Sequence, residues 1–223
     1  MKYKYILFDL DGTITESGPG IMNSVEYALN KMNREVGERD TLKKFIGPPL
    51  TESMEKYYGM SEEEALLGVK YYREYYHDKG IYENRVYDGL EEVLKKINEG
   101  YILAVATSKP EEYAKRIADK FDFAKYFAGI YGATMDGSLI RKADVIRYAL
   151  DNLGVERENY DQVVMVGDRN NDIYGAKENG IQVIGVLYGY GDLVELQSAG
   201  ADYIAKMPEE IAQIIGRCNH ERV

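Results

Sequence analysis

The sequence predicts an α/β fold in which helices cover both faces of a parallel sheet and a small helical domain is inserted near the amino terminus. Three observations support this prediction. From position 88 onward, apolar runs of strand length alternate with segments of helical periodicity. These runs are almost uninterrupted, as is typical of strands that are buried on both faces. Between the first apolar run and this alternation, the composition is helical over residues 17–84.

The first predicted strand, Tyr5–Phe8, runs directly into two carboxylates, Asp9 and Asp11, which Gly12 follows. Side chains alternate with a period of two along an extended backbone, so both acids can project to the same side at the carboxyl end of the strand. Two like charges at such a short distance repel each other, and a bound cation usually compensates them. An ordinary Asp-Gly turn after a strand would also explain this stretch. The choice between a cation site and a plain turn therefore depends on the other motifs of the chain.

The inserted segment 17–84 is predicted to form a helical domain of its own. Helices are expected near 50–58 and 61–79, and the Gly47-Pro48-Pro49 sequence is interpreted as a rigid loop before them. An earlier helix is indicated by apolar residues at helical spacing, which are Ile21, Val25, Ala28, Leu29 and Met32. A tyrosine stripe is expected to pack in the core, with nucleobase stacking as the alternative; it comprises Tyr71, Tyr72, Tyr75 and Tyr76.

The remaining elements follow one another regularly to the end of the chain. In order, we expect a helix over 88–99, a strand over 101–106, a helix after 110, a strand over 126–131, a helix over 142–153, a strand over 163–166, a helix over about 171–179, strands over 182–186 and near 203, and a helix after 208. The glycine-containing segment 187–192 is interpreted as a mobile turn without a catalytic role. Ligands of such sheets bind beyond the carboxyl ends of the strands.

Polar residues stand at two of these strand ends. The 101–106 strand is followed by Thr107-Ser108, whose hydroxyls and backbone donors suit an anion such as phosphate, although a helix cap would explain them equally well. The 163–166 strand is followed by Asp168 and, four residues later, by Asp172. Capping of the next helix explains one of these two acids well.

Lys142 stands at the expected start of a helix, where the positive end of the helix dipole disfavours cations by roughly 0.3–1 kcal/mol. An anionic group is therefore expected close to it. A lysine in contact with solvent is the alternative on local grounds.

Composition and charge narrow the classes of function. The net charge of −10 is spread along the chain, which argues against nucleic-acid polymers and anionic membranes as main partners. Cys218 is the only cysteine, so neither a disulfide framework nor a cysteine metal cluster is expected. The apolar stretch after the amino terminus is too short for a signal peptide or a membrane span, so a cytoplasmic protein is expected, with a monomer as the default.

Four motifs in order resemble those of the haloacid dehalogenase (HAD) superfamily, in its phosphatase branch with a helical cap. They are Asp9-Leu10-Asp11-Gly12-Thr13, then Thr107-Ser108, then Lys142, and then Gly167-Asp168-Arg169-Asn170-Asn171-Asp172. Each motif alone is weak evidence for this superfamily, but four such motifs in the right order at strand ends are specific for it. The resemblance implies a Rossmann-like catalytic core over 1–16 and 85–223, a helical cap over 17–84, and Mg²⁺ as the cofactor.

The resemblance also implies chemical roles for the first motif. Asp9 would be the nucleophile that forms an aspartyl-phosphate and would also be a magnesium ligand. Asp11 would act as general acid and then as general base, and its backbone carbonyl would offer magnesium a further ligand.

The other motifs would bind phosphate and metal. Thr107 and the backbone around Ser108 and Gly12 would hold phosphate oxygens, and Lys142 would neutralise both nucleophile and phosphate. Asp168 would complete the magnesium shell, with Asp172 as a further ligand or as support for it.

The resemblance favours a hydrolase that releases phosphate from a small phosphorylated metabolite, most similar to the phosphoglycolate phosphatase and 5′-nucleotidase groups. An acid at the position of Asp11 argues against a dehalogenase or a phosphonate-cleaving enzyme. A sugar phosphomutase and a catalytically silent phosphate-binding regulatory protein remain as alternatives. Pro48, in the loop of the cap, is expected to face the substrate, because a similar loop does so in the family.

Overall fold

The computed structural model describes residues 2–220, and its internal contacts divide the chain into two compact units. One unit contains the residues up to Thr15 together with those from Val86 onward, and the other is Glu16–Arg85. Two short strands, β2 (Thr15–Glu16) and β3 (Arg85–Val86), pair where the chain passes from one unit to the other.

The larger unit is built on a six-stranded parallel sheet with the strand order β5-β4-β1-β6-β7-β8. This sheet confirms the predicted α/β fold. The short strand β1 lies between β4 and β6, so it is paired on both edges. The strands are β1 (Tyr5–Phe8), β4 (Ile102–Pro110), β5 (Gly129–Ala133), β6 (Val163–Gly167), β7 (Gln182–Val186) and β8 (Tyr203–Ala205).

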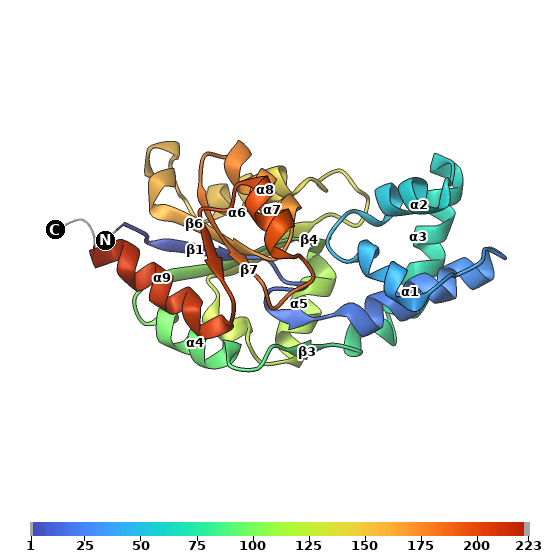
Figure 1. Ribbon diagram of the computed structural model, residues 1–223, viewed down its shortest axis with the longest axis horizontal. Coiled ribbons are helices and arrows are strands. Elements are labelled where there is room, and N and C mark those ends of the chain that lie inside the picture. The colour runs from blue at the N-terminus through green and yellow to red at the C-terminus, as the bar shows by residue number, and fades with distance from the viewer. Residues whose placement is uncertain (1, 221–223) are drawn as a thin grey trace. The chain divides into compact units, whose positions relative to one another are not determined.

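Helices cover both faces of this sheet (Figure 1). Right-handed connections have this result because the chain moves from β1 through β4 to β5 in one direction and from β6 through β7 to β8 in the other. One face is covered by α6 (Lys142–Asn152), α7 (Asn170–Glu178) and α8 (Leu193–Ala199), whose apolar residues share a core with Leu7 and Met165. The opposite face carries α4 (Leu90–Asn98), α5 (Glu111–Lys120) and α9 (Pro208–His220). Turns of 3₁₀-helix, η3 (Ala124–Tyr126) and η4 (Arg157–Gln162), precede β5 and β6.

Three local features differ from the sequence-based expectation. The strand expected over 126–131 is β5, which begins only at Gly129 because Ala124–Tyr126 form the turn η3. Strand β4 does not end at Ala106 but continues to Pro110, because β5 pairs with it through a register shift between Thr107 and Pro110. Proline is tolerated at such an irregular position of a strand. The short helix α8 was not predicted, because its sequence shows no amphipathic period. Leu196 is buried, whereas Leu193 and Val194 are exposed.

The smaller unit is helical. It contains α1 (Gly18–Lys31), η1 (Arg39–Phe45), α2 (Leu50–Tyr58), α3 (Glu62–Tyr76) and η2 (Gly80–Tyr82). Helix α3 begins with a capping box in which Ser61 and Glu64 exchange hydrogen bonds between side chain and backbone. The tyrosine stripe divides between two environments, because Tyr72 and Tyr76 are buried and stack on each other with ring centroids 5.2 Å apart, whereas the other two are only partly buried.

Within residues 2–220, no helix combines the length and the apolar character needed to span a membrane.

The packing of the sheet core predicts how core and surface substitutions change stability. Leu7 is fully buried in β1 and packs in the core that α6 and α7 share, so Leu7→Ala is expected to lower the free energy of unfolding by about 2–5 kcal/mol. Chemical denaturation followed by circular dichroism measures this loss. Leu193→Ala on α8 is the matched control, because its side chain is 43% exposed, and it should change stability by less than about 0.5 kcal/mol. Equal losses for the two variants would contradict this description of the core.

Candidate active site

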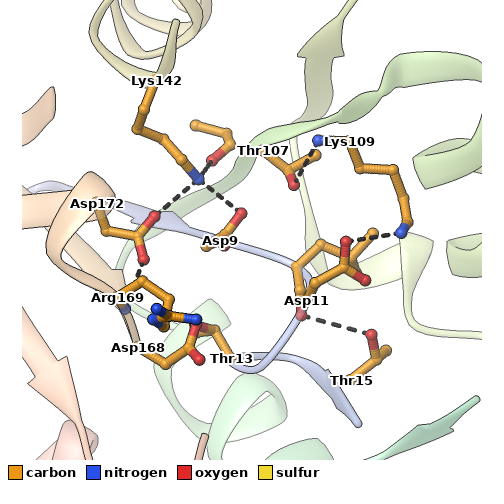
Figure 2. Close-up of polar contacts among 12 residues, drawn as sticks. Asp9, Asp11, Thr13, Thr15, Thr107, Lys109, Lys142, Asp168, Arg169 and Asp172 are labelled. Atoms are coloured by element: carbon orange, nitrogen blue, oxygen red, sulfur yellow. Dashed lines mark hydrogen bonds and ion pairs between the residues drawn. The ribbon is translucent and has the colours of Figure 1, made fainter. Parts of the chain in front are cut away.

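The polar residues singled out in the sequence gather at the carboxyl edge of three neighbouring strands, β4, β1 and β6 (Figure 2). Asp9 directly follows β1, Thr107 lies near the end of β4, and Asp168 directly follows β6. All three side chains are buried. Parallel pairing brings these positions together, although up to 159 residues separate them in the chain.

Three carboxylates form the centre of the site. One oxygen each of Asp9, Asp168 and Asp172 lies within 4.8 Å of the others, and all three residues are buried. Burial raises the pKa of Asp9 to about 6, with further contributions from the charges of Asp172 and Asp11. Burial, together with the charges of Asp172 and Asp9, also raises the pKa of Asp168 well above its usual value. The cluster therefore concentrates negative charge that calls for a cation.

Lys142 supplies a cation from the first turn of α6. Its Nζ lies 2.7 Å from Asp9 Oδ1 and 2.8 Å from Asp172 Oδ1, and it donates a hydrogen bond to the backbone carbonyl of Ala106 at 3.2 Å. Burial alone would lower the pKa of Lys142, but the carboxylates of Asp172 and Asp9 raise it overall. The lysine is buried, so the alternative of a lysine in contact with solvent does not apply.

Asp168 is held by donors from two loops. Its Oδ1 accepts a hydrogen bond from Thr13 Oγ1 at 3.3 Å, and its Oδ2 accepts one from the backbone N–H of Tyr190 at 2.8 Å. Helix α7 begins at Asn170 with Arg169 at its N-cap, so Asp168 does not cap it. Asp172 lies in the first turn, where its Oδ2 accepts from the N–H of Arg169 at 3.0 Å. Capping thus accounts for Asp172 Oδ2 but not for Asp168.

Gly12 allows the first loop to approach Asp168. Its φ of +83° is in the left-handed region, and a Cβ at this position would lie 2.1 Å from Asp168 Oδ2. Only glycine combines this backbone conformation with that approach. The chain then turns back sharply, because the N–H of Gly12 donates to the carbonyl of Thr15 at 2.8 Å.

The predicted phosphate-binding residues on β4 are placed beside the carboxylates. Thr107 is buried, and its Oγ1 accepts a hydrogen bond from the N–H of Lys109 at 3.2 Å. It does not cap the following helix, which begins only at Glu111. Ser108 lies between these two residues, where the pairing register of β4 shifts. Pro48 belongs to the helical unit, and its role at the substrate stays a prediction.

Two features of the site were missed in the sequence. Lys109 donates from its Nζ to Asp11 Oδ2 at 2.6 Å, with both side chains buried, so Asp11 has a cation of its own. The segment 187–192, interpreted as a turn without a role, lies against the site instead. Besides the N–H of Tyr190 on Asp168, the hydroxyl of Tyr188 donates to the carbonyl of Thr13 at 3.0 Å. In the sequence, the alternation of tyrosines and glycines directly after a strand was the signal that could have indicated this role.

The acidic cluster fits a divalent metal ion. Its donors are all oxygens, as Mg²⁺ prefers. Lys142 contacts Asp9 Oδ1 and Asp172 Oδ1, but it is one ammonium beside three buried carboxylates. The negative charge that the lysine leaves uncompensated costs free energy unless a further cation lies beside these acids.

The chain belongs to the haloacid dehalogenase-like hydrolase family, whose model matches residues 6–186. It is accordingly an enzyme, a phosphatase of that family. The match covers every motif from Asp9 to Asp172 and the whole helical unit.

Individual relatives and solved structures match most of the chain and carry different names. A 5′-nucleotidase from Pseudomonas aeruginosa is 42% identical over 199 residues, which are 89% of each chain. The protein named tyrosine-protein kinase PtkA from Mycobacterium tuberculosis is 38% identical over 95% of this chain and 72% of its own length. Among solved structures, a predicted phosphatase from Clostridium acetobutylicum has a TM-score of 0.93 and 44% identity, covering 97% of this chain and all of its own.

The raised pKa of Asp9 predicts how stability depends on pH in the absence of metal. Because the pKa rises from 3.8 to about 6 on folding, the folded protein binds this proton more tightly than the unfolded chain. The free energy of unfolding should therefore fall as pH rises through this window. At pH 7.5 in a chelator, Asp9→Asn should be more stable than the wild type by on the order of 1 kcal/mol.

Thermal melting at pH 4.5 and pH 7.5 measures this effect. The exposed Asp151, also on the larger unit, offers Asp151→Asn as the matched control, which should melt like the wild type at both pH values. A gain for Asp9→Asn that is equal at both pH values, or no gain, would show that burial of this charge is not the cause.

Proposed function

We propose that this protein hydrolyses phosphomonoesters of small metabolites through an aspartyl-phosphate on Asp9. The observation that carries the proposal is the arrangement of this carboxylate, which follows the central strand and lies 2.7 Å from the ammonium of Lys142. The ion pair favours the ionised nucleophile. It also places a positive charge where the charge of a phosphoryl group would otherwise repel the attacking carboxylate.

In the first step a carboxylate oxygen of Asp9 forms a bond to phosphorus, and the bond between phosphorus and the leaving oxygen breaks. Asp11 donates its proton to that leaving oxygen. In the second step a water molecule attacks phosphorus, Asp11 takes a proton from it, and the bond to Asp9 breaks to release inorganic phosphate. The two acids thus have different tasks, and their separate lysine partners are consistent with this division.

The phosphate oxygens are assigned to groups around the nucleophile. Thr107 and the backbone around Ser108 and Gly12 donate to them, and Lys142 contributes charge. Because these groups lie at fixed positions on strand ends, they require little reorganisation during the reaction.

Asp9, Asp168, Asp172 and the backbone carbonyl of Asp11 would hold Mg²⁺. When bound, this ion supplies Lewis-acid charge that neutralises the phosphate and the nucleophile. The oxygen-only donor set and the excess of three buried carboxylates over one lysine support this assignment.

Hydrolysis is preferred to transfer within a sugar phosphate. The family's mutases usually carry a Glu-Asp pair in the last motif, where this chain has Gly167-Asp168. Within the described residues no expected acid or lysine is missing, which argues against a silent phosphate-binding protein.

The substrate is assigned to the nucleotide or phosphoglycolate class. The 42% identity to a protein named 5′-nucleotidase supports the first of these. We assign substrate choice to the helical unit, acting as a cap, with Pro48 facing the substrate. The protein is proposed to work as a monomer in the cytoplasm.

The nucleophile and metal assignments predict a sharp loss of activity. Asp9→Asn should lower kcat for 4-nitrophenyl phosphate at least about a thousandfold, because an amide cannot form the acyl-phosphate. A chelator should abolish wild-type turnover, and added Mg²⁺ should restore it. The exposed control Asp151→Asn should retain full activity. Turnover that survives Asp9→Asn would refute the mechanism.

The substrate class predicts an order of specificity. Release of inorganic phosphate should show a higher kcat/KM for 5′-nucleoside monophosphates than for phosphoglycolate, sugar phosphates or phosphotyrosine. Pro48→Ala should change KM for the preferred substrate more than for 4-nitrophenyl phosphate, which lacks the parts that a cap would contact. Preference for phosphoglycolate, or transfer of phosphate from ATP to a tyrosine peptide, would overturn the nucleotide assignment.

A further inference from the structure

Lys109 is a buried cation to which the proposed chemistry assigns no task. Its side chain is 5% exposed, that of Asp11 is 9% exposed, and the two groups are 2.6 Å apart. Removing charges from water costs several kcal/mol per ion, and this cost is offset only where the geometry of the pair is good. The pair joins the loop after β1 to the end of β4, which are 98 positions apart in sequence.

The irregular end of β4 delivers this lysine. Thr107 and Lys109 both belong to the part of β4 where regular pairing ends, and such irregularities re-aim side chains. The pairing register with β5 shifts between Thr107 and Pro110, and the N–H of Lys109 bonds to Thr107 Oγ1 at 3.2 Å. The residue assigned to hold phosphate therefore also fixes the backbone from which Lys109 reaches Asp11 (Figure 2).

The two oxygens of Asp11 are in different situations. Lys109 engages Oδ2, whereas Oδ1 is buried and has no hydrogen-bond partner within residues 2–220. Rotation of the carboxyl group would break the contact with Lys109. One oxygen is thus held in place, and the other has no hydrogen-bond partner within the described residues that would compete for its proton.

We propose that Lys109 is a positioning residue that holds Asp11 by Oδ2, so that Oδ1 is the oxygen that exchanges a proton with the leaving group and then with water. This inference rests on the proposed function, because it takes Asp11 as the acid. Each acid then has its own lysine, since Lys142 contacts Asp9 and Lys109 contacts Asp11.

The test compares two substrates of similar shape, phenyl phosphate and 4-nitrophenyl phosphate, in saturating Mg²⁺. The phenolate of the first is a much stronger base and needs a proton as it leaves, whereas nitrophenolate leaves readily without one. The value of kcat/KM reports the step in which the leaving group departs.

Lys109→Met removes the ammonium and keeps an unbranched side chain. We expect it to lower kcat/KM for phenyl phosphate about tenfold more than for 4-nitrophenyl phosphate, which is part of the roughly 10²–10⁴-fold contribution of a general acid. Asp11→Asn should show the same sensitivity to the leaving group. Lys109→Arg, which keeps a cation, should recover part of the loss. Lys115→Met, an exposed lysine on α5, is the matched control and should not discriminate between the substrates.

A double variant guards against a simple folding defect. Lys109→Met/Asp11→Asn leaves no unpaired carboxylate at this position, and it should match Asp11→Asn within about twofold, because the two residues act as one unit. Circular dichroism and thermal melting check that each variant is folded.

The outcomes separate the inference from the function on which it rests. If Asp11→Asn discriminates between the substrates but Lys109→Met lowers both equally, Lys109 has only a structural role and the inference is overturned. Additive losses in the double variant overturn it as well. If Asp11→Asn itself lowers both substrates equally, the acid assignment in the proposed function is wrong, and the inference falls with it.

Discussion

The repulsion among buried carboxylates is the constraint on which this structure depends. Asp9, Asp168 and Asp172 lie together in a site from which water is largely excluded, and such a group is unfavourable without compensating charge. Lys142 provides part of that compensation by contacting two of the three acids at once. One lysine does not balance three carboxylates, so negative charge remains for a metal ion. The stability of the unit is therefore tied to the same charges that its chemistry uses.

The order of the strands makes this arrangement possible. Because β1 lies between β4 and β6, residues that end three parallel strands meet at one edge of the sheet. Helix α6 packs on the same sheet through Val145 and Ile146, and this packing brings the lysine of its first turn to the acids. Apolar packing thus supplies the free energy that holds like charges together. The loop after β7 also holds Asp168, because the backbone N–H of Tyr190 donates a hydrogen bond to its carboxylate.

Much of the site could be predicted because its residues have local signatures. Asp9 follows an apolar run of strand length, and Lys142 stands at a helix start where the helix dipole disfavours a cation, so each is anomalous in its own neighbourhood. Lys109 has no such signature, since a lysine before a proline and a helix is ordinary. Tyr188 and Tyr190 act through groups whose partners the sequence does not reveal, the former through its hydroxyl on a distant carbonyl and the latter through its backbone N–H.

The sequence by itself determined the alternation of strands and helices, the parallel sheet, and the residues that carry charge at the strand ends. These are consequences of apolar periodicity and of residue type, which are local properties. Only the tertiary structure decided which charges pair, that Asp11 is bound to Lys109 while Asp9 is bound to Lys142, and that Gly12 leaves room for Asp168. Pairing depends on distances of 3 Å or less between residues about 100 or more positions apart, and sequence spacing does not contain those distances.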